Sequence, residues 1–170
     1  SMHSSQNEQD SRYYAGFAMI PVLEPSNQQE AYDMAYDGFA LSEQTGLPVM
    51  LRITTRLAHS RSGVIRKEVK PGNELRLPKD LKQFILLPAI ARRRYQELLD
   101  KQQLLKALSG ASGYNRYLEA TDKSLGIVCC GIAVNYLQEC FSGSVCPYPV
   151  IRLSQYPLPE KLLNRMHDEC

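Results

Sequence analysis

The fold is decided by residues 18–56, which read AMIPVLEPSNQQEAYDMAYDGFALSEQTGLPVMLRITTR. The stretch begins with a short apolar run that ends at Pro25, a pattern typical of a buried strand. It ends with residues 48–56, where branched side chains favour a second strand. A helical pattern lies between the two, with short joints on either side. This order predicts a βαβ unit with parallel strands and a right-handed crossover.

The helix between these strands has recognisable signals at both ends. Asn27 and Glu30 form a capping-box pattern, in which each side chain accepts the backbone N–H of the other residue. Gly46 suits the cap at the carboxyl end, and Pro48 prevents the helix from continuing. Mostly small residues recur at steps of three and four, which predicts one helix face made of Ala31, Met34, Ala35, Gly38, Phe39 and Ser42.

The last third of the chain repeats this logic. Residues 124–133 read SLGIVCCGIA, a nearly continuous apolar strand that runs into Gly131. A short helical pattern follows over residues 133–143, and PYPVIRLSQ, residues 147–155, is expected to be the next strand. Pro159 lies where a final helix begins, since the first turn of a helix does not need its N–H. We therefore expect a second βαβ unit.

The middle of the chain has a different character. Residues 58–88 are charged and interrupted by Gly and Pro, which indicates a connection between two units, with a short hairpin at KPGNE, residues 70–74. A helix is then expected up to Gly110, with Arg93 and Glu97 four residues apart on its exposed face. Its helical spacing is carried by Tyr95, Leu98, Leu99, Leu105 and Leu108.

Composition narrows the class of protein. The chain has 170 residues, of which 44% are hydrophobic and 22% charged, as in an ordinary globular protein. Its formal net charge of +2 argues against a dedicated nucleic-acid-binding protein. No apolar run reaches the length of a membrane span, and the N-terminal residues show no apolar core of a signal peptide. A cytoplasmic location is expected.

The five cysteines fit a reducing compartment, because they are odd in number and gathered in the last third: Cys129, Cys130, Cys140, Cys146 and Cys170. Cys129 and Cys130 are neighbours in the apolar run, so a strand would point them to opposite faces. The spacing C-x-x-C is not present, so we predict no metal site.

Three groups of residues have the chemistry to bind an anion. Arg92–Arg94 could contact phosphate, although three successive residues spread around a helix and favour a solvated surface. The second group follows the carboxyl end of a parallel strand, where α/β proteins place ligands, and consists of His59 with Arg56, Ser60 and Arg61; a surface loop is the simpler interpretation. Gly131 could offer free N–H groups at a strand-to-helix turn, or could serve close packing.

The chain opens with a polar segment, SMHSSQNEQDSR, residues 1–12. Such a segment suits a flexible tail, but it equally suits the wall of a polar pocket. It runs directly into DSRYYAGFA, residues 10–18, which is typical of a packed helix with Asp10 or Ser11 as its cap.

These residues carry a resemblance to a known family. The motifs MHSSQNEQDSRYYA (2–15), LEPS followed by QEA (23–31) and LPVMLRITTRLAHSR (47–61) resemble the alpha subunits of indolepyruvate ferredoxin oxidoreductases. These belong to the thiamine diphosphate-dependent 2-oxoacid:ferredoxin oxidoreductases. LGIVCCGIA (125–133) and RLSQYPLPEKLL (152–163) resemble a later part of the same subunit, in the same order.

The resemblance implies an internal fragment with an α/β fold, made of two partial three-layer α/β/α units with parallel βαβ elements. Residues 1–61 would be the C-terminal part of a pyrimidine-binding-like domain. Residues 62–86 would be a linker, and residues 87–170 a truncated transketolase C-terminal-like domain.

The resemblance also implies an activity for the full enzyme, the oxidative decarboxylation of arylpyruvates such as indolepyruvate to acyl-coenzyme A with ferredoxin as electron acceptor. Its partners would be a beta subunit, ferredoxin, the arylpyruvate and coenzyme A. Its cofactors would be thiamine diphosphate with Mg²⁺ and iron–sulfur clusters. In the family, the loop near the active-site cleft corresponds to the candidate cofactor-binding residues His3, Ser4, Ser5, Gln6 and Asn7.

Several parts of the family's site are not expected in this chain. The glutamate that contacts the aminopyrimidine lies upstream of Ser1 in the family, and the Gly-Asp-Gly motif for diphosphate and Mg²⁺ lies in another domain. The one Asp-Gly pair, Asp37-Gly38, falls inside a helix, and the cysteines are not spaced for clusters. We therefore expect no catalytic residue, no fully bound cofactor and no activity of the fragment alone. Unpaired strand edges predict self-association.

Two alternatives from other classes stay open at this point. The chain could be a non-catalytic α/β module that binds or scaffolds a partner. It could also bind RNA through Arg92–Arg94, which the low net charge argues against. We expect neither a nucleic-acid nor a membrane partner.

Overall fold

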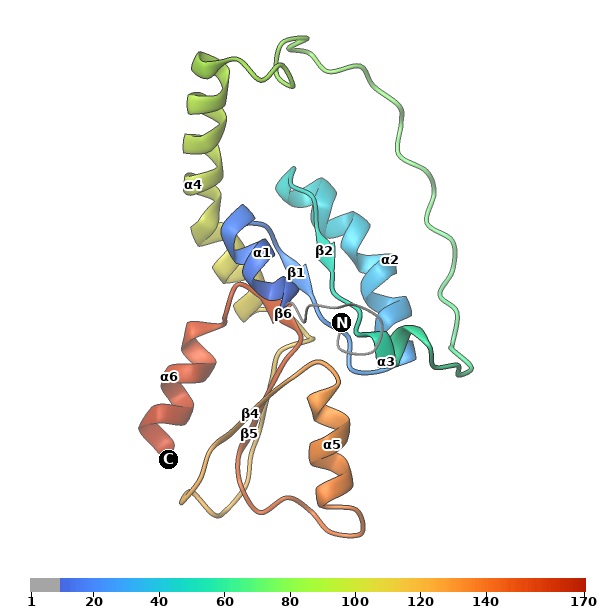
Figure 1. Ribbon diagram of the computed structural model, residues 1–170, viewed down its shortest axis with the longest axis vertical. Helices are drawn as coiled ribbons and strands as arrows, with labels where there is room; N and C mark the ends of the chain where they lie inside the picture. The colour runs from blue at the N-terminus through green and yellow to red at the C-terminus, as the bar shows by residue number, and fades with distance from the viewer. Residues whose placement is uncertain (1–9) are drawn as a thin grey trace.

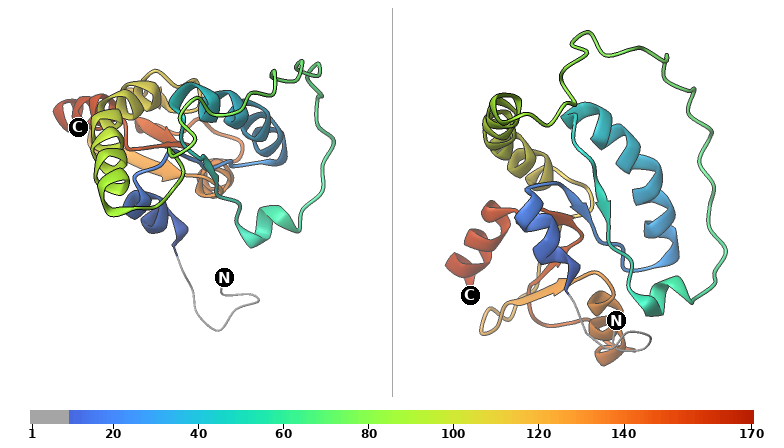
Figure 2. Two further views of the ribbon diagram at one scale, coloured as in Figure 1. Left: turned by 90° about the horizontal axis from the view of Figure 1, so that it is seen from above. Right: turned by 45° about the horizontal axis from the view of Figure 1, so that its top comes forward.

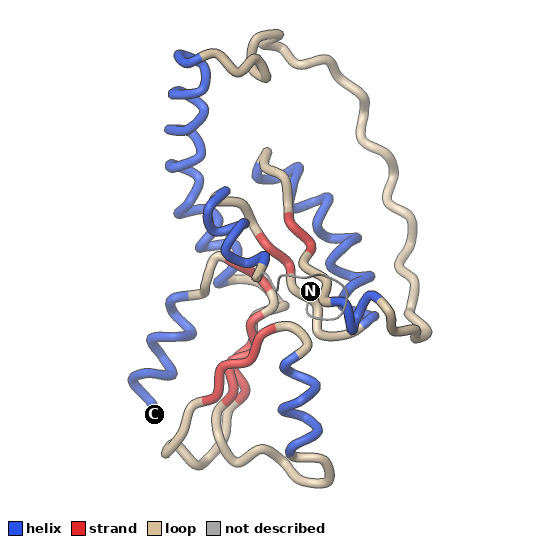
Figure 3. The backbone as a smooth tube through the Cα atoms, in the orientation of Figure 1, coloured by secondary structure: helices blue, strands red, loops and turns tan. Residues whose placement is uncertain are grey.

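The computed structural model describes residues 10–170, which form two small sheets flanked by helices (Figure 1). The first sheet has the strand order β2-β1-β6, and the second has the order β3-β5-β4. Figure 3 shows the strands as two short stacks that meet near the middle of the molecule. Parallel and antiparallel pairs occur in both sheets, which confirms the expected α/β class.

The first βαβ unit is confirmed. It consists of β1 (Val22–Leu23), α2 (Gln28–Thr45) and β2 (Met50–Leu51), and β1 pairs with β2 in parallel. Both strands are shorter than the apolar runs predict, with two residues each. The reason is local, because prolines flank these strands and cannot donate to a ladder.

The ends of α2 follow the sequence signals, with one difference. The Asn27 side chain accepts the N–H of Glu30 at 2.9 Å, and Gly46 caps the other end with a φ of 63°. The Glu30 carboxylate does not return to Asn27 but accepts the N–H of Ser26 at 2.9 Å and its hydroxyl at 2.8 Å. The reciprocal half of the capping box is therefore displaced by one residue.

The second βαβ unit is also confirmed. It consists of β4 (Ile127–Cys130), α5 (Ala133–Cys140) and β5 (Val150–Leu153), with β4 parallel to β5. β3 (Arg116–Leu118), which the sequence pattern did not indicate, pairs antiparallel on the other side of β5.

The second unit has three layers, since helices pack on both faces of its sheet. Cys129 packs with Val134 of α5, whereas Cys130 packs against the group that contains Met166 of α6 (Glu160–Glu169). Figure 1 shows α5 and α6 on either side of β4 and β5. The expectation that the two neighbouring cysteines point to opposite faces is thus confirmed.

The two sheets are joined at Ser154, a residue with no exposed surface. On one side of it lies β5, and on the other β6 (Gln155–Tyr156), which pairs antiparallel with β1 of the first sheet. Asn115 holds this crossing point, because its Oδ1 accepts the N–H groups of Ser154 at 2.8 Å and Gln155 at 3.0 Å. One continuous stretch of chain therefore serves both sheets.

The remaining helices are α1 (Ser11–Ala18), α3 (Thr55–Ala58) and α4 (Pro88–Gly110). Asp10 caps α1 as expected, with its side chain accepting the N–H of Arg12. In α4 only the later part is well packed, since Leu105 is buried whereas Tyr95 is 56% exposed. Among residues 10–170 no helix combines the length and the apolar character needed to cross a bilayer.

The connection between α3 and α4 contains no hairpin, so that expectation for residues 70–74 is wrong. Its first part instead lies along α2, where side chains of the helix bind its backbone at Ile65, Lys67 and Glu68. Figure 2 shows how the chain then leaves α2 and arcs towards the start of α4. Backbone groups held by another element are not available for a hairpin ladder.

Candidate functional site

Polar side chains gather where the parallel strands end. Glu24 comes directly after β1, Arg52 directly after β2 and Gly131 directly after β4. Ligands of α/β proteins bind outside the carboxyl ends of parallel strands, so this edge is the candidate site. We use the name Glu24 cluster for Asp10, Arg12, Glu24, Arg52 and Tyr156, whose side chains form one connected network.

Glu24 is the centre of this cluster and is only 3% exposed. Its Oε1 accepts a hydrogen bond of 2.6 Å from Nη1 of Arg52, and its Oε2 accepts one of 2.9 Å from the hydroxyl of Tyr156. Nη1 of Arg12 lies 3.9 Å from Oε2. A buried carboxylate is tolerated only when it is paired and hydrogen-bonded, and Glu24 meets both conditions.

Asp10 and Arg12 extend the cluster to the start of α1. Nη2 of Arg12 lies 2.5 Å from Oδ2 of Asp10, and Nε of Arg52 lies 3.7 Å from Oδ1 of Asp10. The hydrogen bond from Arg12 lowers the pKa of the Asp10 carboxyl to about 2, and the same bond raises the pKa of Arg12. Both groups therefore stay charged near neutral pH, and the first turn of α1 is fixed to the strand ends.

Tyr156 contributes a neutral donor. Burial raises the pKa of its hydroxyl, and the charge of Glu24 acts in the same direction. The hydroxyl therefore stays protonated and donates a hydrogen bond to Glu24.

The N–H of Gly131 itself is not free for an outside anion. Its own N–H donates to the carbonyl of Leu153 at 3.3 Å, and its φ is +49°. A β-carbon at this position would lie 2.5 Å from Oε1 of Glu24. Of the two interpretations of this glycine, close packing is the one that the geometry supports.

A second group of polar residues lies beside the first, and we call it the Glu30 cluster. Arg152 of β5 pairs with the Glu30 carboxylate, and its Nη2 also donates to the Ser26 hydroxyl at 2.7 Å. Nδ2 of Asn135 on α5 donates to the carbonyl of Ser26 at 2.8 Å. This cluster therefore ties the start of α2 to the second sheet and to α5.

The polar groups that remain without a partner at this edge are N–H donors of arginine side chains. Nε of Arg52 and Nε of Arg152 are buried and have no hydrogen-bond partner within residues 10–170. The carboxylates Glu24 and Glu30 are both committed to arginines. Among residues 10–170, this edge thus has unused N–H donors and no free carboxylate, an arrangement that favours an anionic group.

The cofactors that the family resemblance implies do not fit the described residues. An aminopyrimidine ring needs a carboxylate that is free to contact it, and neither Glu24 nor Glu30 is free. Within residues 10–170 no three His, Cys, Asp or Glu side chains are grouped so that they could hold a metal ion. We therefore derive no chemical step through these groups.

The residues singled out from the sequence have different outcomes. His3, Ser4, Ser5, Gln6 and Asn7 lie outside the described residues.

Arg56, His59 and Arg61 are all exposed, and the guanidinium of Arg56 lies 5.4 Å from the ring centre of Tyr136 on α5. The surface interpretation therefore describes this segment better than a built anion site, although Thr54 caps it as the short helix α3 rather than leaving it a loop.

Two of the three successive arginines are ion-paired on the surface of α4. Arg93 lies 3.3 Å from Asp80 and 3.8 Å from Glu97, and Arg94 lies 2.6 Å from Glu97. Carboxylates that neutralise these arginines leave less charge for a phosphate backbone. The solvated-face interpretation of Arg92–Arg94 is supported.

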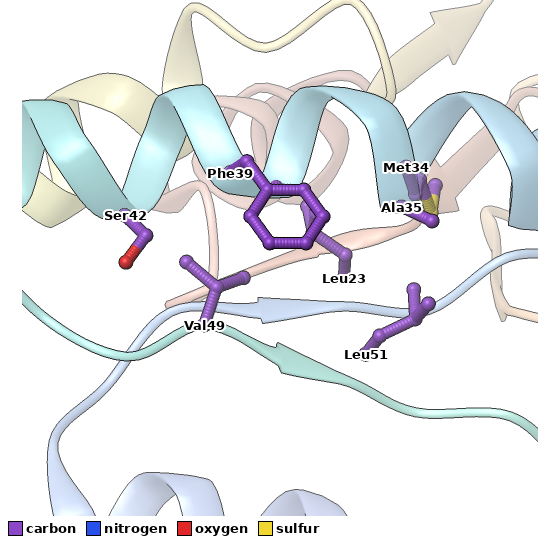
Figure 4. Close-up of a pocket in the computed structure, with 8 residues that line it drawn as sticks. Leu23, Met34, Ala35, Phe39, Ser42, Val49 and Leu51 are labelled. Carbon is purple, nitrogen blue, oxygen red and sulfur yellow. The ribbon is translucent and has the colours of Figure 1, made fainter. Parts of the chain in front are cut away.

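Two hollows lie in this half of the molecule. One of about 360 Å³ lies beside the Glu24 cluster, between α1, α4 and the segment after β6, and its lining includes Arg12, Tyr156 and Lys106. The other, of about 290 Å³, lies between α2 and the first sheet and is largely apolar. Figure 4 shows Phe39 of α2 above Leu23 and Val49 in the second hollow.

Sequence reasoning did not single out Glu24, Arg52, Arg152 or Tyr156. Two signals were present, because Glu24 is an acidic residue at the end of an apolar strand, and Arg52 lies inside the second one. A charge that interrupts an apolar strand needs a partner of opposite sign. The partner itself can be found only once the strands are placed side by side.

Comparison with known proteins shows extended similarity to one kind of subunit. The indolepyruvate oxidoreductase subunit IorA of Methanothermobacter thermautotrophicus is 41% identical over 96% of this chain, and that of Archaeoglobus fulgidus is 40% identical over 96%. The subunit IorA of Thermococcus kodakarensis is 35% identical over 99% of the chain. The resemblance inferred from the sequence motifs is thereby confirmed.

The similarity covers only part of these relatives. The chain spans 27% of the length of each of the three subunits. None of the protein-family models matches the chain. The chain is therefore related, over nearly its whole length, to about a quarter of an oxidoreductase subunit.

Proposed function

We propose that this chain is part of the alpha subunit of an indolepyruvate oxidoreductase. The observation that supports this is its identity of 35–41% to subunits of that name over 96–99% of the chain. At this level of identity over an entire matched segment, the fold and the role of the segment are expected to be shared.

The reaction that we propose for the whole enzyme is the oxidative decarboxylation of arylpyruvates to acyl-coenzyme A, with ferredoxin as the acceptor of the electrons. Thiamine diphosphate with Mg²⁺ and iron–sulfur clusters would supply the chemistry when bound. Because Glu24 and Glu30 are paired with arginines, we assign these cofactors to other parts of the enzyme. A beta subunit, ferredoxin and coenzyme A complete the proposed partners.

The role that we assign to the described residues is to fix one edge of the site. The Glu24 cluster attaches the first turn of α1 to the ends of β1 and β2. The segment that precedes Asp10 carries His3, Ser4, Ser5, Gln6 and Asn7, which we propose as residues that line the cleft. Asp10 and Arg12 would then position the start of α1 next to that segment.

The test uses the full-length protein together with its partner subunit. We expect dye reduction that depends on indolepyruvate, coenzyme A and thiamine diphosphate. Replacing His3, Gln6 or Asn7 by alanine should lower this activity, whereas the control Tyr13→Phe, at an exposed tyrosine of α1, should leave it unchanged. Full activity in all three alanine variants would remove these residues from the proposed cleft.

A second measurement concerns the chain alone. Residues 1–170 with added thiamine diphosphate and Mg²⁺ should show no arylpyruvate-dependent dye reduction. Turnover by the isolated chain would contradict the proposal that the cofactors are held elsewhere.

The proposal includes a cytoplasmic location. It is supported by the five cysteines, all of which lie within the described residues and are unpaired there, because thiols remain reduced in that compartment. Thiol labelling of the protein in intact cells, compared with labelling after oxidation, would test it.

A further inference from the structure

Residues 60–70, which we call the strap, have no regular secondary structure, yet they are attached along the outer face of α2. The side-chain amide of Gln29 makes two hydrogen bonds with the backbone of Ile65, accepting its N–H at 2.7 Å and donating to its carbonyl at 3.2 Å. The hydroxyl of Tyr32 accepts the N–H of Lys67 at 2.9 Å. The hydroxyl of Tyr36 donates to the carbonyl of Glu68 at 2.8 Å.

The residues of α2 that make these bonds share one side of the helix. Gln29, Tyr32 and Tyr36 are spaced three and four apart, so their side chains form a row along the axis. Each one binds a backbone group of the strap. In β-strand addition, the edge of a sheet binds the backbone of an extended chain through its own backbone groups. The row on α2 binds an extended backbone in a similar way, but through side-chain atoms.

Charged side chains add selectivity to this row. Nζ of Lys67 lies 3.3 Å from Asp33 and 3.2 Å from Asp37, and Nζ of Lys70 lies 3.8 Å from Asp37. Nζ of Lys70 is also 4.0 Å from the ring centre of Tyr36. Two lysines that are three residues apart in the strap thus contact two acidic residues and one aromatic ring of α2.

Asp37 connects this surface to the second unit. Its Oδ2 accepts a hydrogen bond of 2.7 Å from the hydroxyl of Tyr114, which lies just before β3. Burial opposes the charge of Asp37, but the bonds from Tyr114 and Lys67 outweigh it and lower the pKa of the carboxyl. Burial, together with the bond to Asp37, raises the pKa of Tyr114.

We propose that the outer face of α2 is a binding surface for an extended peptide with two lysines three residues apart. The strap occupies this surface within the same chain. The bound lysines hold the Asp37 carboxylate in the position where it accepts the Tyr114 hydroxyl, so the strap couples α2 to the second unit. Neutralisation of these lysines releases the strap and loosens the contact at Tyr114, whereas a competing peptide with the same two lysines displaces the strap and keeps that contact.

Amide hydrogen exchange of the full-length protein tests whether the strap is bound. The N–H groups of Ile65 and Lys67 should exchange more slowly than the backbone N–H groups of residues 73–77, which have no hydrogen-bond partner among the described residues. Tyr32→Phe removes one acceptor and should make Lys67 exchange roughly two- to tenfold faster, as expected for the loss of one net hydrogen bond.

The matched control is Tyr95→Phe, at an exposed tyrosine of α4, which should leave the strap unchanged. Equal exchange rates for residues 65–68 and 73–77 in the unaltered protein would overturn the proposal. So would an equal effect of Tyr32→Phe and Tyr95→Phe on Lys67.

The coupling between the strap and Tyr114 is tested by a double variant whose substitutions lie in the strap and not in the second unit. Lys67→Met with Lys70→Met should speed exchange of the strap and also of the N–H groups of Tyr114 and Asn115, which bond to Ser112. Faster exchange in the strap alone would show that Tyr114 is held independently, and this outcome would refute the coupling. A peptide of residues 62–72 added in excess should speed exchange of the strap but leave Tyr114 and Asn115 unchanged, because it supplies the same two lysines to Asp37, whereas the same peptide with both lysines replaced by methionine should change neither.

Discussion

The carboxylate of Glu24 lies against the backbone of Gly131, so closely that a β-carbon on Gly131 would be 2.5 Å from Oε1 of Glu24. Glu24 belongs to the end of the first parallel pair of strands, and Gly131 to the end of the second. Their contact brings the two strand ends together at one edge. The absence of a side chain at residue 131 is what leaves room for the buried ion pair between Glu24 and Arg52.

Gly131→Ala should therefore be strongly destabilising. The methyl group would displace the Glu24 carboxylate from Arg52, and the φ of +49° strains any residue with a β-carbon. We expect a loss of roughly 2–4 kcal/mol in the free energy of unfolding, measured with denaturant. The control is Gly143→Ala, which has a φ of +87° but open space around it and should cost only about 1 kcal/mol.

Arg52→Met should cost more than the removal of an exposed ion pair. It leaves the buried Glu24 carboxylate without its nearest cation, and breaking a buried pair on one side costs roughly 3–5 kcal/mol. Arg76→Met, at an exposed pair with Glu74, should change stability by less than about 1 kcal/mol. The double variant Glu24→Gln, Arg52→Met should be more stable than Arg52→Met alone, and the reverse order would show that Glu24 does not depend on Arg52.

Asn115→Ala should weaken the crossing between the two sheets. The side chain accepts the N–H groups of Ser154 and Gln155 and donates to the carbonyl of Gln155 at 2.9 Å, all in a buried place. Leaving buried backbone groups without partners should cost roughly 2–4 kcal/mol in denaturant unfolding. Asn164→Ala, on the exposed side of α6, serves as the control and should be close to neutral.

The Asp10 carboxyl should contribute to stability at neutral pH and lose that contribution in acid. Its pKa is lowered from the ordinary aspartate value of 3.8 to about 2 by the hydrogen bond from Arg12. A depressed pKa in the folded state means that the contribution is complete above about pH 4 and declines as the pH falls towards 2. Asp10→Asn keeps a good cap for α1 but removes the charge, so its stability should fall less steeply across this range. Parallel acid curves for the two proteins would contradict the assignment.

The cysteines should react in an order set by their exposure. Burial raises the pKa of the Cys129 thiol, which is only 6% exposed, so little thiolate is present and little of it is accessible. Cys140 and Cys170 are exposed. Alkylation at pH 8, followed by mass spectrometry, should label Cys140 and Cys170 first and Cys129 only after unfolding. Early labelling of Cys129 would show that the sheet beneath α5 opens readily.

The local features of the fold follow from short sequence patterns. The caps of α2 at Asn27 and Gly46, and the opposite directions of Cys129 and Cys130, depend on residues within one or two turns or on neighbouring positions in a strand. The two βαβ units follow from the alternation of apolar runs with helical spacing. Such periodic signals depend on local backbone geometry, so the sequence alone is enough to identify them.

The sequence was less informative about how residues 60–70 bind to α2 and about which part of α4 is buried. Residues 60–70 contain the Gly, Pro and charge pattern of a linker, and only their contacts with Gln29, Tyr32 and Tyr36 show that they are bound. Helical spacing predicts α4, but not that Tyr95 is exposed while Leu105 is buried. Periodicity identifies the face of a helix that is apolar, whereas the neighbouring elements decide how far along the helix that face is covered.

The α/β class, the two strand–helix–strand units and the family resemblance could be inferred from residues that are close together in the chain. The candidate site could be identified only from the folded protein. Glu24 meets Arg52 across 28 residues and Tyr156 across 132, and β6 joins the first sheet after leaving the second. Hydrogen bonds and ion pairs act over a few ångströms in space and are independent of separation along the chain, so their partners become known only when the strands have been placed.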